Sequence, residues 1–302
     1  MEFSKEKEKW LESRKTSLKG YYVGDTIAKA KHADVYYREA LDKELDRFIS
    51  SLQKELKSVY SVIKVENAAT KRKPSIASVR IVLNAYKNAK LKILLKNSRK
   101  IIEKWLKLAT NATDKSIKKI LFNMAGKELA IEYDSAYDEA LKLMIQRNVQ
   151  LITNTATQTL TNIENIVYNG MTTGRGWKDL EGEMYKQTHI SRDRIKLIAQ
   201  DQTNKTNQAL NQLGQQAAGI KYFEWWGAAD ERERELHWVL NGKIFKWGDS
   251  PERLPIIDTY GTRGYPGDAV RCRCSSRPVW IMSGYKAVWQ GDNKGYKIIK
   301  SR

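Results

Sequence analysis

The 302-residue sequence has few of the residues that build metal or redox centres. It contains two cysteines and three histidines, and a metallohydrolase usually needs more ligands than these provide. No apolar run approaches the roughly 20 residues that a membrane span requires. The charged N-terminal stretch lacks the apolar segment of a signal peptide. We therefore expect synthesis in a reducing cytoplasm and no membrane span.

Acidic residues are absent from one long stretch of the chain, residues 67–102. The chain carries 54 Lys+Arg against 35 Asp+Glu, and residues 64–119 contain sixteen basic and three acidic residues. A one-sided field of this kind indicates contact with phosphates or with an acidic protein surface, whereas the alternative is a lysine-rich solvated face. The candidate contact residues are Lys71, Arg72, Lys73, Lys92, Lys96, Lys100 and Lys104.

Apolar residues at spacings of three and four predict long helices in the first two thirds of the chain. The first helix covers about residues 25–66, and Pro74 breaks the pattern that follows it. Stripes at residues 91–108 and 145–167 predict two more helices, which pack along one another as an elongated bundle. The uncharged stretch 148–163 predicts either a polar face against another subunit or a weakly stable helix.

The segment 169–177 is rich in glycine and predicts a flexible joint, and it lacks the ending of a phosphate-binding loop. Two helices follow, the second capped by Ser191 and stopped by Gly219. Aromatic, strand-like stretches come next. The predicted fold is mainly α, with an elongated helical N-terminal part and a small α+β C-terminal domain. The expected parts are a helical region (1–170), the α+β domain (171–283) and a basic tail (284–302).

The two cysteines, Cys272 and Cys274, stand one residue apart, and this spacing would strain a disulfide between them. They could bind zinc together with His237 and a fourth ligand from Asp230, Asp268 or water. They could instead be small buried side chains in a tight turn, or thiols activated by neighbouring arginines. One Cys-x-Cys pair is weaker evidence for zinc than two Cys-x-x-Cys pairs, so the buried structural role is the preferred interpretation.

The residues around His237 could also form a catalytic site. A histidine near the carboxylate of Asp230 could perform general acid–base chemistry. No serine or cysteine lies in an identifiable nucleophile motif. A charge-paired structural turn, with Asp230 bound by Arg232 or Arg234, is therefore favoured over a catalytic site.

Three stretches, "IKLIAQDQTNKTN", "WWGAADERERELHWVLNGKIFKW" and "YPGDAVRCRCSSRPV", occur in this order. Together they resemble the phage Mu protein F-like family of head morphogenesis (minor head) proteins, over about residues 175–280. The sequence departs from the family pattern at Gln200, at residues 233–235 and at Tyr265. The motif positions that the resemblance implies to be structural are Asp201, Gln202, Trp225, Arg234, Gly242 and Pro266.

The resemblance implies a non-enzymatic minor head protein of a tailed bacteriophage, acting in head assembly and DNA delivery. It implies as partners the portal protein, the procapsid interior (scaffold or major capsid protein) and double-stranded DNA. The expected location is the virion, inside the capsid near the portal, after assembly in the host cytoplasm. The alternatives are a metal-dependent nuclease that uses His237, Asp230 and the two cysteines, and a free nucleic-acid-binding protein.

Overall fold

The computed structural model describes residues 20–27, 30–70, 76–125, 131–228 and 230–301. The chain divides into two compact units. Unit 1 comprises Met1–Lys31, Lys107–Leu141 and Asp201–Arg302, and unit 2 comprises His32–Leu106 and Lys142–Gln200. The predicted fold class is confirmed, because long helices are followed by a small antiparallel sheet.

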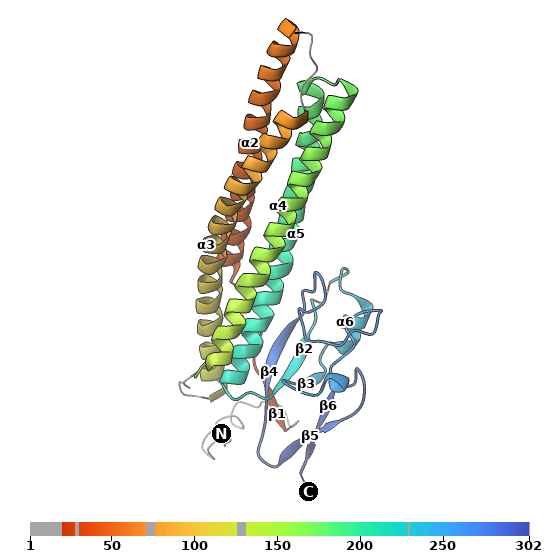
Figure 1. The fold of residues 1–302 in the computed structure, drawn as a ribbon. Helices are drawn as coiled ribbons and strands as arrows, with labels where there is room; N and C mark the ends of the chain where they lie inside the picture. Colours follow the sequence, from red (N-terminus) through yellow and green to blue (C-terminus); the bar gives the residue numbers. More distant parts are fainter. Residues whose placement is uncertain (1–19, 28–29, 71–75, 126–130, 229, 302) are drawn as a thin grey trace. The chain divides into compact units, whose positions relative to one another are not determined.

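Four long helices dominate the described chain (Figure 1). They are α2 (Lys31–Thr70), α3 (Ile76–Ala125), α4 (Ser135–Thr173) and α5 (Trp177–Ala217). Unit 2 is built from α2 and from parts of the other three, which lie side by side. The stripe predicted on the first helix is buried there, at Leu41, Leu45, Phe48, Leu52 and Leu56.

Unit 2 has an aromatic and polar contact at its centre. The rings of Tyr37 and Trp105 stack with centroids 4.2 Å apart, and both side chains are fully buried. The Tyr37 hydroxyl donates a hydrogen bond of 2.7 Å to Asn148 Oδ1, so the buried hydroxyl is satisfied. Of the stripe predicted at residues 91–108, Leu94 and Trp105 are buried, whereas Leu108 is exposed.

The uncharged stretch 148–163 packs inside unit 2 through α4. Thr155 and Thr159 are buried, and their hydroxyls donate to the carbonyls of Leu151 and Thr155, four residues earlier. The Thr159 hydroxyl also lies 2.8 Å from that of Ser191. These side chains fill the interior because the helix backbone itself satisfies their hydroxyls.

The segment 169–177, predicted as a flexible joint, is a tight turn between two helices of unit 2. Helix α4 runs on to Thr173, and α5 begins at Trp177. Gly174 adopts a left-handed φ of +71°, the usual way for a helix to end. A Cβ on Gly170 would lie 2.2 Å from Leu180 Cδ2, so this glycine allows the two helices to approach closely.

Helix α5 is one continuous helix, whereas the sequence predicted two. Ser191 lies within it rather than at an N-cap, and its hydroxyl donates to the Gln187 carbonyl at 2.9 Å. Burial of Ser191 at the helix interface explains why a good capping residue occurs inside a helix. The predicted stop is confirmed, because the helix ends at Ala217 and Gly219 has φ +76°.

Unit 1 contains a six-stranded antiparallel sheet in the order β1-β4-β2-β3-β6-β5. The predicted basic tail, 284–302, supplies the last two strands of this sheet, because Ala287, Trp289 and Ile298 pack against its hydrophobic cluster. The strands are β1 (Tyr21–Val23), β2 (Tyr222–Trp226), β3 (Ile244–Lys246), β4 (Ser275–Ile281), β5 (Tyr285–Trp289) and β6 (Tyr296–Lys300).

Helix α5 is fastened to the sheet by a buried chain of amides. Asn211 Nδ2 donates to the carbonyl of Ser276 at 3.0 Å, and Gln215 Nε2 donates to Asn211 Oδ1 at 2.6 Å. The Trp247 indole then donates to Gln215 Oε1 at 3.0 Å. Each buried polar group is thus paired, which fixes the start of β4 against the helix.

Candidate functional site

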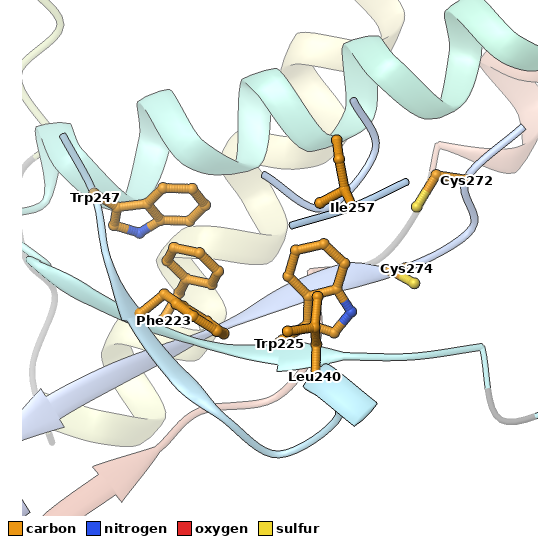
Figure 2. Close-up of a cluster of buried hydrophobic side chains, with 8 residues drawn as sticks. Phe223, Trp225, Leu240, Trp247, Ile257, Cys272 and Cys274 are labelled. Carbon is orange, nitrogen blue, oxygen red and sulfur yellow. The ribbon is translucent and has the colours of Figure 1, made fainter. Parts of the chain in front are cut away.

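The two cysteines and His237 come together inside unit 1. His237 lies on α6 (Glu235–Leu240), and the cysteines precede β4 in an extended segment. Alternate residues from Cys272 to Pro278 are buried, as expected for one face of a strand. Both sulfurs therefore point to the same side, where they join the buried cluster of Phe223, Trp225, Leu240, Trp247 and Ile257 (Figure 2).

The histidine ring faces both sulfurs with one nitrogen. His237 Nδ1 lies 3.6 Å from Cys272 Sγ and 3.3 Å from Cys274 Sγ. The other nitrogen, Nε2, lies 2.9 Å from the carbonyl of Ile257, so Nε2 carries a proton and donates it. The three side chains are only 2–4% exposed, and their ligand atoms all lie within 4.8 Å of one another.

These close contacts shift the pKa values of the cluster. Hydrogen bonds from Cys274 and, to a lesser extent, from His237 together lower the pKa of Cys272 to about 4. The hydrogen bond with Cys272, together with burial, raises the pKa of Cys274. Burial lowers the pKa of His237, but its hydrogen bond to Cys272 outweighs this and leaves the pKa raised. Cys272 is therefore the thiolate of the pair.

Asp230, predicted as a fourth ligand, is not part of this cluster. Its carboxylate receives two hydrogen bonds from Arg273, which lower the pKa of Asp230. Arg232 also contacts it, whereas Arg234 instead donates to the Val270 carbonyl at 2.6 Å. The charge-paired turn therefore exists, with Arg273 as its main partner.

Of the carboxylates near the cluster, the sequence reasoning missed Glu233. Its Oε1 lies 3.8 Å from Cys274 Sγ, where it is a second acceptor within reach of the one thiol proton of Cys274. The other alternative, Asp268, accepts a hydrogen bond from the backbone nitrogen of Tyr265 at 2.7 Å. The available signal was a carboxylate four residues before His237, although Glu233 lies in the turn that precedes α6 and not in the helix itself.

Several positions that carried the family resemblance hold this cluster in place. Asp201 on α5 accepts a hydrogen bond of 2.8 Å from the backbone nitrogen of Arg271. Arg271 has a left-handed φ of 58°, which is strained for a residue with a side chain. This conformation turns the chain immediately before Cys272, so Asp201 acts as a positioning residue.

The Pro266–Gly267 turn supports the cluster from another side. Pro266 is buried, and Gly267 donates its backbone N–H to Cys272 Sγ at 3.4 Å. Gly267 has φ +94°, and a Cβ there would lie 2.7 Å from Gln208 Cγ on α5. The turn therefore requires glycine for both its conformation and its approach to the helix.

The remaining motif positions are structural in the same way. Trp225 is fully buried, and its ring meets the edge of His237 at 5.5 Å between centroids. Gln202 is buried on α5 next to Asp201. Gly242 has φ +74° in the turn between α6 and β3, and its N–H donates to the Trp225 carbonyl at 2.9 Å.

A second candidate site is the row of lysines on α3. Lys92, Lys96, Lys100 and Lys104 are exposed and recur at every fourth residue, so they share one face of the helix. Lys104 Nζ lies 4.7 Å from the centre of the Tyr36 ring. The other predicted contact residues, Lys71, Arg72 and Lys73, lie outside the described residues.

Comparisons with known proteins agree with the resemblance seen in the sequence. Over 261 residues the chain is 25% identical to an uncharacterized protein of Haemophilus influenzae, covering 84% of this chain and 54% of that protein. The chain thus spans about half the length of this relative, and no solved structure matches it. In the described part of the chain, no helix is long and apolar enough to cross a membrane. Residues 161–277 match the family model "Phage Mu protein F like protein", which supports the resemblance to this family that the sequence showed.

Proposed function

We propose that this protein is a minor head protein of a tailed bacteriophage, with a structural role in head assembly and DNA delivery. The observation that carries the proposal is the family match over residues 161–277. The geometry supports it, because Asp201, Trp225 and Pro266 are used to build the interior of unit 1. The proposed partners are the portal protein and the procapsid interior, either scaffold or major capsid protein, and the proposed location is the capsid interior near the portal.

The lysine face on α3 supports a further part of the proposal, which is contact with packaged double-stranded DNA. Helix α3 contains twelve basic and two acidic residues, and the four lysines of the face are exposed. Like charges four residues apart destabilise a helix by about 0.2–0.5 kcal/mol per pair. The face therefore costs the isolated helix stability, and a polyanion neutralises this repulsion when it binds.

The DNA contact is tested by replacing Lys92, Lys96, Lys100 and Lys104 together with glutamine. We expect weaker binding to duplexes of any sequence, because lysine contacts phosphates and not base edges. The slope of log K against log salt should fall by up to about 3.6, since each lost phosphate contact contributes about 0.9. Fluorescence anisotropy with labelled duplexes at several salt concentrations measures both quantities.

A matched variant controls for the change in net charge. Lys43, Lys54, Lys178 and Lys186 are also exposed in unit 2, on α2 and α5. Replacing these four with glutamine should lower affinity less and leave most of the slope. Equal losses in the two variants would show that the lysine face has no special role and would remove DNA contact through α3 from the proposal.

The assembly role is tested by co-expressing this chain with the portal, scaffold and major capsid proteins of the same phage. We expect the chain in purified procapsids and in complexes with the portal. Procapsids that form normally and contain none of it would contradict the assignment as a head protein. Co-purification with DNA alone would favour a free nucleic-acid-binding protein.

A further inference from the structure

We propose that Cys272, Cys274, His237 and Glu233 bind one zinc ion, which cross-links the irregular segments of unit 1. The inference goes beyond the assembly role, because it concerns how the unit holds its shape. Zinc binding is measured on the purified chain alone, whereas the assembly role is measured in procapsids. Either proposal can therefore fail without the other.

The spacing of the ligand atoms fits a tetrahedral metal. Zn–S bonds of about 2.3 Å and Zn–N bonds of about 2.0–2.1 Å at tetrahedral angles separate sulfur and nitrogen by about 3.6 Å. The two observed separations between His237 Nδ1 and the sulfurs are 3.6 Å and 3.3 Å. Two thiolates, an imidazole and a carboxylate form a donor set that favours zinc among the common divalent metals.

The surroundings of the ligands also have the character of a metal site. Because Nε2 of His237 donates its proton to the Ile257 carbonyl, Nδ1 is the nitrogen that faces the two sulfurs and that would give up its proton to bind the ion. A second-shell hydrogen bond of this kind accompanies most zinc-bound histidines. Gly267 donates its N–H to Cys272 Sγ, as expected around a sulfur that carries negative charge.

The position of Trp225 also indicates negative charge on the sulfurs. Its buried indole N–H makes no well-formed hydrogen bond among the described residues, and the group that it interacts with is the Cys274 sulfur. The nitrogen lies on the edge of the ring that faces Cys274 (Figure 2). A buried unpaired N–H is costly, and a nearby metal-bound thiolate would compensate it electrostatically.

Glu233 is placed to complete the ligand set. Its Oε1 lies 3.8 Å from Cys274 Sγ, and a Cβ on Gly227 would lie 2.0 Å from the same oxygen. The glycine thus leaves room for the carboxylate at this position. The carboxylate lies beside Cys274 and not yet beside the other two ligands, so as the fourth ligand it would turn toward Cys272 and His237.

The burial of the cluster assigns the ion a structural role. Structural zinc sites have four protein ligands, whereas catalytic sites keep one position open to water. Cys272, Cys274 and His237 are nearly inaccessible, and Asp230 is engaged by Arg273. This arrangement does not favour the nuclease interpretation.

The long connection between β3 and β4 is a segment that a bound ion would stabilise. Residues 247–274 contain one short 3-10 helix, η1 (Pro251–Arg253), and one isolated β-bridge between Ile256 and Arg263, and are otherwise irregular. Irregular connections of this length are uncommon in compact domains without an additional constraint. The two cysteines lie 35 and 37 residues from His237 in the sequence, so the ion would close a long loop.

The first test is the metal content of the full chain purified without chelators. We expect about one zinc ion per chain by inductively coupled plasma mass spectrometry. Exchange for cobalt under anaerobic conditions should give a sulfur-to-cobalt charge-transfer band and the visible bands of tetrahedral coordination. Protein that is folded, contains no bound metal and gives no such spectrum on cobalt addition would overturn the proposal.

Variants then assign the ligands. Cys272→Ser together with Cys274→Ser should remove the bound metal and the charge-transfer band, whereas His32→Asn, an exposed histidine in unit 2, should change neither. Glu233→Gln should retain the sulfur band but lower zinc affinity by roughly 10–100-fold, as a lost ligand or orienting group does. Its control is Glu231→Gln, an exposed neighbour expected to bind zinc normally. Unchanged affinity in Glu233→Gln would overturn the assignment of Glu233.

Because the double cysteine variant could fail to fold, a measurement on the unaltered chain is also needed. Removing the metal with a chelator should lower the thermal midpoint of unit 1, and adding zinc back should restore it. A midpoint that is independent of zinc in a metal-containing protein would overturn the structural role of the ion.

Discussion

At the scale of single residues, the chain uses a strained backbone position to aim its cysteines. Arg271 is left-handed at φ 58°, and its N–H is held by Asp201 Oδ1 at 2.8 Å. A left-handed conformation costs an ordinary residue roughly 1–2 kcal/mol. The hydrogen bond to a charged acceptor, worth about 1.5–3 kcal/mol, offsets this cost.

Two substitutions of Asp201 therefore separate the effect of its hydrogen-bond acceptor from the effect of its negative charge. We expect Asp201→Ala to lower the free energy of unfolding by about 1–3 kcal/mol, because the Arg271 N–H loses its partner. Asp201→Asn keeps an oxygen that can accept this hydrogen bond and loses the contacts of Oδ2, which are the ion pair with Lys205 and a hydrogen bond from Gln202. It should cost less than half as much in chemical denaturation. Equal losses would show that these contacts of Oδ2, and not the turn, explain the role of Asp201.

At the scale of elements, two glycines of the α4–α5 hairpin have opposite effects on stability. Gly170 lies where α4 meets Leu180 of α5, and an added Cβ would clash with that side chain at 2.2 Å. Gly182 lies on an exposed part of α5, with no atom within 4 Å of an added Cβ. One glycine is required by packing, and the other only weakens its helix.

Replacement of each glycine by alanine should consequently change stability in opposite directions. Gly170→Ala should lower the free energy of unfolding by about 1–3 kcal/mol, because it overpacks the contact. Gly182→Ala should raise it by up to about 1 kcal/mol through the higher helix propensity of alanine. Thermal unfolding followed by circular dichroism measures both variants, and a stabilising Gly170→Ala would contradict the close approach of α4 and α5.

At the scale of the whole molecule, the region that matches the family and the physical unit have different limits. The match, residues 161–277, ends inside β4 after Arg277. It leaves out β1, which pairs with β4, and β6, which pairs with β3. It also leaves out Ile117 and Leu121 of α3, which belong to a buried cluster with Ile220. The residues that match the family model thus form only part of unit 1, which also contains segments far from them in the sequence.

A fragment limited to residues 161–277 should for this reason fail to fold cooperatively. We expect it to show helical circular dichroism without a sharp thermal transition, and to lack slowly exchanging amides in β2 and β4. The full chain should show both features under the same conditions, measured by hydrogen exchange. Protection of β2 and β4 in the fragment would show that β1, β5 and β6 are dispensable for the unit.

The sequence by itself determined the helical character of the first two thirds of the chain, the strands β2, β3 and β4, and the family resemblance. It did so because apolar periodicity, glycine stops and motif order are local properties of the chain. It also indicated that His237 and the cysteines belong together, although Asp230, one of the fourth ligands that it offered, is bound by Arg273 in the structure.

Only the tertiary structure decided which distant groups meet. It placed Glu233 beside Cys274, set Asp201 under Arg271, and enclosed the polar threonines of α4 inside unit 2. It also turned the expected tail into β5 and β6. The physical reason is that these contacts join residues tens of positions apart, so no local pattern carries them. They form because buried polar groups and apolar faces must each find a partner across the fold.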